Sequence, residues 1–219
     1  MRQLFVTGAH TDVGKTYVAC AMLRAARAKG LSVAALKPAV SGIDEADWAQ
    51  SDPGRLLAAM GRPLTLAELD AIAPLRFTAP LSPPMAARLE EVDLRISTLT
   101  EFCRAGLAAS AADLMLVEGA GGVMSPMAED GTGLDLMVSL GLPSVVVGGS
   151  YLGAISHTLT AIETLRARGL PIAAVVISQS GEPDAPDFAQ TVDSVAAFAG
   201  EVKIIAAARD DEAWASELV

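Results

Sequence analysis

The sequence predicts an α/β protein built on a parallel sheet that helices cover on both faces. Six short apolar runs recur along the chain, and helix-like stretches separate most of them. Strands that are apolar on both faces are typical of parallel sheets covered on two sides, and the intervening helices supply right-handed crossovers. The expected strands comprise residues 4–6, 33–36, 114–117, 144–147, 172–177 and 202–205.

The composition predicts one domain spanning residues 1–219. The chain has 219 residues, of which 52% are apolar and 19% charged, and this is too apolar for a disordered chain. No apolar run approaches the ~18 residues that span a bilayer, and the first run begins at Leu4, which leaves no room for a signal peptide. We therefore expect a cytoplasmic protein with no membrane partner.

Charge and cysteine content narrow the possible partners. The 26 acidic side chains outnumber the 16 basic ones, and a net charge of −10 would repel nucleic acid. Cys20 and Cys103 lie far apart and form no Cys-x-x-Cys pair, so we expect two buried thiols without a disulfide. These features favour small-molecule partners and no nucleic acid.

Residues 8–16, Gly-Ala-His-Thr-Asp-Val-Gly-Lys-Thr, follow the first strand and lead into a helix, which predicts a phosphate-binding loop. In such a loop, backbone N–H groups and the helix N-terminus bind the β-phosphate, Lys15 reaches the β and γ oxygens, and Thr16 ligates Mg²⁺. Gly14 lets the backbone approach the anion closely. Ala9 stands where the common motif has its first glycine, so this loop is longer than usual.

The other elements are predicted from periodicity and from breaker residues. The helix after the loop has Val18 and Met22 on one face and ends at Gly30. Between residues 38 and 84, prolines and glycines interrupt short helical pieces, so we expect an insertion over the active-site edge. Residues 210–219 predict a short peripheral helix.

The second expected strand leads directly into Lys37, and Ser41 follows four residues later. Ligands of open α/β sheets bind beyond the carboxyl ends of the strands, so we expect both side chains to face the γ-phosphate held by Lys15. Two lysines around one phosphate would neutralise the charge that develops during phosphoryl transfer. The alternative is that Lys37 is a solvated strand end.

The third expected strand leads into Glu118 and the glycine-rich segment 119–122. We expect Glu118 in the Mg²⁺ shell; the alternative is a carboxylate that caps the following loop. The glycines permit close backbone approach to a ligand. A dinucleotide-binding fingerprint is excluded because Met124 replaces its last glycine and Pro126 interrupts the expected helix start.

Asp52 is a candidate for the second Mg²⁺ carboxylate, since Mg²⁺ sites use one or two carboxylates with water and phosphate oxygens. The sequence does not separate it from Asp44 or Asp47. Ser51 or Asp52 also suits the start of a helix with Pro53 in its first turn, and the two roles are compatible.

Residues 148–157 follow the fourth expected strand and lead into a helix, which predicts a second anion site where helix N-terminal amides hold a carboxylate. Leu152 stands where the G-x-S-x-G elbow of a serine hydrolase needs glycine, and no serine has a recognisable base partner. We therefore exclude serine-hydrolase chemistry and expect His157 to be a helix-surface or packed residue.

Taken together, these motifs resemble those of the dethiobiotin synthetases. The match runs in order through about four-fifths of the chain, and only the phosphate loop is specific by itself. The matching segments are residues 8–16, 37–42, 51–52, 82–83, 118–122 and 152–157.

The resemblance implies a P-loop NTPase-like α/β domain and an ATP-dependent ring closure of 7,8-diaminononanoate with CO₂, which yields dethiobiotin, ADP and phosphate. One substrate amine would capture CO₂ as a carbamate, whose oxygen attacks the γ-phosphate to give a carbamic-phosphoric anhydride. The second amine would then close the ring.

The resemblance also assigns roles to residues of this sequence. Lys15 and Lys37 would be catalytic and bind the γ-phosphate and the carbamate, while Thr16, Asp52 and Glu118 would hold Mg²⁺. The implied nucleotide-binding residues are Asp12, Val13, Gly14, Lys15, Thr16, Tyr17, Asp52, Glu118, Gly119, Ala120, Gly121 and Ser178. The implied substrate-binding residues are Thr11, Lys37, Ser41, Tyr151, Leu152, Gly153 and Ser156. The turn from Tyr151 to Ser156 would bind the substrate carboxylate across the interface of a homodimer.

Several positions depart from the family pattern. His10 stands where the family often has Asp or Gly, and Ser156 where it commonly has Asn, but neither change removes a charged catalytic group. Ser178 stands where many relatives have an Asn that contacts adenine, and residues 204–207 differ from the proline-containing adenine loop. Because base discrimination depends on paired hydrogen bonds, we hypothesise that other nucleoside triphosphates are accepted nearly as well as ATP.

The main alternative is a nucleotide-switch ATPase of the partition or septum-placing type. Those proteins resemble K-G-G-x-x-K-[ST], which His10 and Thr11 do not fit, and the acidic chain offers no DNA-binding patch. An amide-forming ligase of cobalamin synthesis would need a glutaminase domain, for which no chain remains. A non-catalytic nucleotide-binding module is the third alternative.

Overall fold

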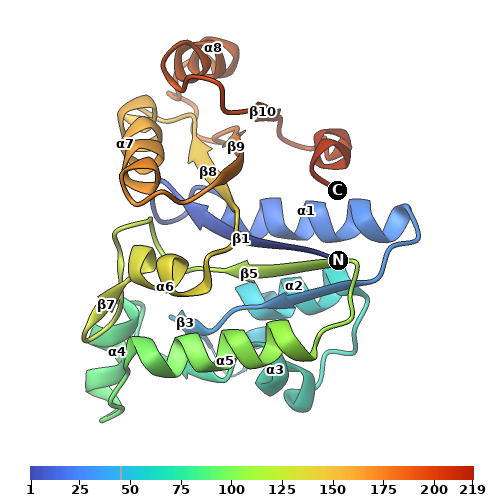
Figure 1. The fold of residues 1–219 in the computed structure, drawn as a ribbon, viewed down its shortest axis with the longest axis vertical. Helices are drawn as coiled ribbons and strands as arrows, with labels where there is room; N and C mark the ends of the chain where they lie inside the picture. The colour runs from blue at the N-terminus through green and yellow to red at the C-terminus, as the bar shows by residue number, and fades with distance from the viewer. Residues whose placement is uncertain (45) are drawn as a thin grey trace.

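The computed structural model describes residues 1–44 and 46–219 and places all six expected strands in one parallel sheet. The strands are β1 (Arg2–Gly8), β2 (Val33–Leu36), β5 (Leu114–Glu118), β8 (Ser144–Gly149), β9 (Ile172–Ser178) and β10 (Ile204–Ala207). Their order is β10-β9-β8-β1-β5-β2, which Figure 1 shows from top to bottom. The predicted fold class is confirmed.

Helices cover the two faces of this sheet because alternate residues of its strands point to opposite sides. Leu4 and Val6 of β1 belong to one buried cluster, whereas Phe5 belongs to the other. The first cluster includes residues of α1 (Lys15–Ala28), α2 (Asp52–Met60) and α3 (Leu66–Ile72). The second includes residues of α4 (Pro83–Leu89), α5 (Ile96–Ala109), α6 (Gly133–Leu140), α7 (Ala154–Ala167) and α8 (Phe188–Phe198).

Short elements that the sequence did not predict surround the carboxyl edge of the sheet. Strand β3 (Ala39–Ser41) pairs in parallel with β4 (Leu75–Phe77), and β6 (Pro126–Ala128) pairs antiparallel with β7 (Gly131–Thr132). Strands of two or three residues are too short to display a period. The first pair lies in the predicted insertion, whose short helical pieces, including the 3₁₀ turn η1 (Trp48–Gln50), are present.

The C-terminal segment differs from its prediction. The predicted short helix is present as the 3₁₀ helix η2 (Ala213–Leu218), but one side of it is packed against the core while Ala213, Ser216 and Glu217 are exposed. Trp214 and Leu218 are buried in the same cluster as α1. The two termini lie side by side, since the Arg2 guanidinium donates to the Leu218 carbonyl at 2.6 Å (Figure 1).

Two further expectations concern the thiols and the membrane. Cys20 and Cys103 are buried free thiols, as predicted, and burial raises the pKa of each to about 12. Within the described part of the chain, none of the helices combines the length and apolarity that a bilayer span requires.

Candidate active site

The predicted phosphate loop joins the end of β1 to the start of α1. Gly14 has φ 94°, a left-handed conformation that favours glycine, and α1 begins at the next residue. A Cβ at Gly14 would lie 2.9 Å from the Ser178 hydroxyl oxygen, so the end of β9 packs directly against the loop. The loop therefore presents its backbone at the carboxyl edge of the sheet, where an anion can approach the start of α1.

Lys15 folds back across this loop. Its ammonium donates to the His10 carbonyl at 3.2 Å, and only 7% of the residue is exposed. The pKa of Lys15 is lowered to about 8, first by burial and then by the positive charge of Lys37, against the opposing effects of Glu118 and Asp52. The charge of Lys37 therefore acts on Lys15, and the convergence of both lysines on one phosphate stays a prediction.

Lys37 lies in a buried cluster of charges behind the loop. Its Nζ is 2.6 Å from Glu118 Oε1 and 2.9 Å from Asp52 Oδ2, and it donates to the Gly119 carbonyl at 3.0 Å. Burial alone would lower the pKa of Lys37, but Glu118 and Asp52 outweigh it and raise that pKa. Since Lys37 is 1% exposed, the alternative of a solvated strand end is excluded.

The parallel register brings this cluster together. Leu36 is paired with Val117 and Val6 with Glu118, so Lys37 and Glu118 both emerge beside the phosphate loop. The Thr16 hydroxyl donates to Glu118 Oε1 at 2.7 Å. Glu118 thus faces the loop and Lys37, and it is not a cap for the segment that follows it.

The structure also separates the three candidate aspartates. Asp52 joins the cluster through Lys37, and although burial would raise the pKa of Asp52, Lys37 and Thr16 bring it below its ordinary value. Asp44 instead accepts from the Ala46 amide at 2.9 Å, and Asp47 precedes η1. Ser51 occupies the N-cap position of α2 without a side-chain capping bond, so this helix start leaves Asp52 available to the cluster.

The chemistry of these donors fits Mg²⁺. Glu118 is fully buried, and its Oε2 has no hydrogen-bond partner. An unpaired carboxylate oxygen beside the Thr16 hydroxyl and Asp52 provides the oxygen ligands that Mg²⁺ prefers. Among residues 1–44 and 46–219, no group of three or more His, Cys, Asp or Glu side chains forms a self-sufficient metal site. Such an ion would therefore complete its coordination with phosphate oxygens and water.

The glycine-rich segment 119–122 runs along the phosphate loop. The Val123 amide donates to the Gly8 carbonyl at 3.0 Å, and a Cβ at Gly122 would lie 3.1 Å from the Ala9 carbonyl oxygen. Gly121 has φ 66°. Small residues in this segment therefore allow it to pack against the phosphate loop, while the predicted approach of its backbone to a ligand stays a prediction.

A cavity of about 1080 Å³ extends from the phosphate loop to the ends of β9 and β10. The predicted residues Thr11, Asp12, Val13, Gly14, Tyr17, Tyr151, Leu152 and Ser178 line it. It is also lined by residues that were not predicted, among them residues 179–182 after β9 and Arg209, Asp210 and Glu212 after β10. They follow β9 and β10, so the rule that ligands bind beyond the carboxyl ends of strands would have found them.

A second cavity, of about 460 Å³, adjoins the first at Thr11 and His10. Its other walls are residues 122–126 and one side of α7, including His157. The His10 and His157 rings stack with centroids 5.6 Å apart, so the prediction that His157 is a packed or surface residue is confirmed.

Two predicted substrate-binding residues face elsewhere. Ser156 lies with Ile155, Leu159 and Phe198 along a shallow groove on the outside of α7 and does not line the two cavities described above. The Ser41 hydroxyl donates to the Leu81 carbonyl within the insertion. Tyr151 and Gly153 lie at the start of α7, where the Tyr151 hydroxyl is 2.8 Å from His157 Nδ1.

The fold, the phosphate loop and the carboxylates behind it define this molecule as a nucleotide-binding protein of the P-loop class. It is similar to the MinC:MinD cell division protein complex of Aquifex aeolicus, with a TM-score of 0.57 and 13% identity over 99% of this chain and 86% of that chain. It is also similar to the hydrogenase maturation factor HypB of Archaeoglobus fulgidus, with a TM-score of 0.55 and 14% identity over 100% and 86%. These identities show the fold alone and do not favour the nucleotide-switch alternative.

Sequence relatives identify the family. Residues 2–210 match the model of a family described as an AAA domain. The ATP-dependent dethiobiotin synthetase BioD of Phenylobacterium zucineum is 59% identical over 219 residues, which cover 100% of this chain and 94% of the relative. That of Methylobacterium nodulans is 45% identical over 214 residues, covering 95% and 94%. This chain therefore belongs to the family of ATP-dependent dethiobiotin synthetases, which confirms the resemblance seen in its motifs.

Proposed function

We propose that this chain is an ATP-dependent cyclo-ligase that converts 7,8-diaminononanoate and CO₂ to dethiobiotin. The observation that carries the proposal is the cluster behind Lys15, in which the buried residues Lys37, Glu118 and Thr16 meet the partly exposed Asp52. Phosphoryl transfer needs concentrated positive charge at one triphosphate terminus, and this cluster brings two ammonium groups and oxygen ligands for a cation to it. The relatives named for this activity share the whole length of the chain.

The reaction has three bond-forming steps. An unprotonated substrate amine attacks CO₂ and releases a proton, which gives a carbamate. A carbamate oxygen then attacks the γ-phosphorus, and the bond to the β,γ-bridging oxygen breaks to release ADP. Finally, the second amine attacks the carbonyl carbon of the carbamic-phosphoric anhydride, phosphate leaves, and a proton is released as the ring closes.

The residues around the loop would act on the second step. Lys15 would contact the β and γ oxygens, and Lys37 would stabilise the carbamate and the transferred group. Thr16, Asp52 and Glu118 would hold Mg²⁺, which when bound would neutralise charge on the triphosphate. Asp12, Val13 and the rest of the loop would bind phosphate through the backbone.

We also propose a homodimer in which the start of α7 serves the partner's site. This explains why Ser156 faces an outer groove and why Leu152 is 90% exposed. Phe198 on the same groove is 73% exposed, so a partner surface would remove apolar area from water. Light scattering should give twice the mass of the chain, and Leu152→Asp should reduce dimerisation. A monomer at micromolar concentration would contradict this proposal.

The nucleotide-base preference follows from the wall of the large cavity. Ser178 lies against Gly14 and is only a short hydroxyl, and Ala207 follows on the next strand. Neither side chain offers the paired donor and acceptor of an amide. Gln179 on the same wall does carry an amide, but its oxygen already accepts from the Arg209 backbone N–H at 2.8 Å. Discrimination between bases should therefore be weak. Steady-state rates with ATP, CTP and GTP test this hypothesis, and a preference for ATP above about a hundredfold would contradict it.

The activity itself is tested by incubating the protein with diaminononanoate, bicarbonate and MgATP. ADP should be released in step with dethiobiotin measured by mass spectrometry, and omission of the diamine should stop both. ATP hydrolysis that is independent of the diamine would instead favour a nucleotide switch. We expect small-molecule partners alone, without nucleic acid or membrane, in keeping with the net charge of −10.

A further inference from the structure

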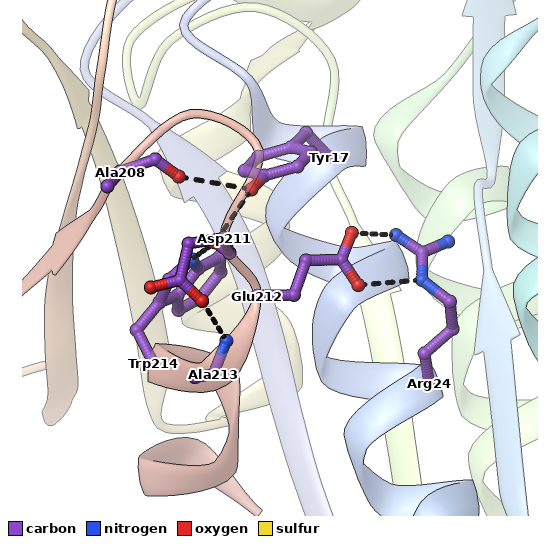
Figure 2. Close-up of polar contacts among 7 residues, drawn as sticks. All are labelled: Tyr17, Arg24, Ala208, Asp211, Glu212, Ala213 and Trp214. Carbon is purple, nitrogen blue, oxygen red and sulfur yellow. Dashed lines mark hydrogen bonds and ion pairs between the residues drawn. The ribbon is translucent and has the colours of Figure 1, made fainter.

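The segment that follows β10 is fastened to α1, the helix that begins in the phosphate loop (Figure 2). The Tyr17 hydroxyl lies 3.2 Å from the Asp211 carbonyl oxygen and 3.4 Å from that of Ala208. About two turns further along α1, Arg24 donates two hydrogen bonds to the Glu212 carboxylate, and the Nε to Oε2 distance is 2.9 Å. Both ends of residues 208–212 are therefore held by side chains of α1.

Helix η2 fixes the same segment from its other side. The Trp214 indole donates to the Asp211 carbonyl at 2.7 Å and packs against Tyr17, with ring centroids 6.0 Å apart. Trp214 and Leu218 are buried against α1, and the Lys29 ammonium donates to the Val219 carbonyl at 2.9 Å. The C-terminal segment thus follows α1 along most of its length.

Residues 208–212 also form a wall of the large cavity. Arg209, Asp210 and Glu212 line it together with Gly14 and Tyr17. Asp210 has φ 62°, a left-handed conformation that is costly for a residue other than glycine. Such a loop holds its shape only where contacts outside it impose that shape. Here Tyr17 and Arg24 of α1 supply such contacts, together with Trp214 of η2 and Gln179 after β9.

We propose that Tyr17 and Arg24 are positioning residues that set the affinity for the nucleoside part of a bound nucleotide. This rests on the proposed function, because it takes the large cavity to be the nucleotide site. The phosphates lie at the start of α1, so the nucleoside must extend toward the ends of β9 and β10. If residues 208–212 are already ordered before binding, the binding free energy is not reduced by the entropy cost of ordering them. Loss of the anchors should therefore weaken nucleoside contacts and spare phosphate contacts.

The test compares ADP with inorganic tripolyphosphate as ligands of the whole protein by calorimetry. Arg24→Met and Tyr17→Phe should each weaken ADP binding about threefold to tenfold, as expected for losing one exposed ion pair or hydrogen bond, with tripolyphosphate binding unchanged. Arg24→Lys retains the charge and should recover part of the loss. Arg88→Met removes a similar two-donor pair with Glu129, remote from the cavity, and should change neither ligand.

Two outcomes would overturn the inference. If both ligands weaken equally in Arg24→Met, the variant disturbs the phosphate loop; if ADP binding is unchanged, the wall does not depend on its anchor. Thermal melts identify a variant that fails to fold. If Arg24→Met does not fold, ADP binding by Arg24→Lys tests whether the wall depends on its anchor. Failure of the proposed function is distinct, because it would appear in the unmodified protein as ATP hydrolysis that does not depend on the diamine, whereas the inference concerns ADP binding alone.

Discussion

Replacing Lys15 with methionine should stabilise the nucleotide-free protein while it abolishes phosphate binding. The folded state disfavours the charged form of Lys15. Burial is the main reason and the charge of Lys37 the second, and the pKa of Lys15 is lowered from 10.5 to about 8. Each pKa unit is worth about 1.4 kcal/mol, so the ammonium costs the folded state about 3 kcal/mol at pH 7. Methionine has a similar length and carries no charge.

The net gain is smaller because the bond from Lys15 to the His10 carbonyl is lost. A hydrogen bond contributes about 1 kcal/mol, which leaves a stabilisation of about 2 kcal/mol. For a chain of this size, that raises the melting temperature by about 4–8 °C. Urea unfolding without metal or nucleotide at pH 7 measures the gain, and tripolyphosphate binding should fall below detection.

The pH dependence gives the sign of the effect. Between about pH 8 and pH 10.5 the folded state has lost the Lys15 proton while the unfolded state retains it, so the stability of the unmodified protein rises with pH. Below about pH 8 the free-energy cost of burying the charged Lys15 ammonium is fully present. The stability difference between the two proteins should therefore be largest at pH 7 and shrink toward pH 10.5.

Lys203→Met removes an exposed lysine and should change stability by less than about 0.5 kcal/mol. A Lys15→Met protein that is less stable than the parent at pH 7, or a gap that does not vary with pH, would refute the reasoning.

Three further substitutions test the same site. Lys37→Gln should lower turnover far more than it weakens nucleotide binding, because its charge matters most as the anhydride forms; unchanged turnover would remove Lys37 from the catalytic residues. Glu118→Gln leaves the buried Lys37 with one carboxylate and should destabilise the fold by about 3 kcal/mol in urea unfolding, a result that a merely exposed pair would not give. Gly14→Ala should greatly weaken ADP binding, since its Cβ would meet Ser178 at φ 94°, whereas Gly30→Ala, at φ 76° with open space around it, should leave binding unchanged. Equal losses in the two alanine variants would show that backbone strain, and not contact with Ser178, is responsible.

The amino-acid sequence by itself determined the sheet strands, the phosphate loop and the family. The six main strands are continuous apolar runs, and the loop is a contiguous motif, so both are properties of neighbouring residues. The same local signals located Lys37 and Glu118 at the ends of their strands. Short strands such as β3 and β4 escaped prediction because three residues display no period.

Only the tertiary structure decided which of these residues meet. It selected Asp52 over Asp44 and Asp47, turned Lys37 into a buried ion pair, and packed the C-terminal helix against α1. Each outcome depends on residues that are far apart in sequence and adjacent through sheet register, such as Val6 and Glu118. The pKa of Lys15 follows from the same cause. Burial and the charge of Lys37, which is distant in sequence, lower that pKa, and the residues next to Lys15 in the sequence indicate neither effect.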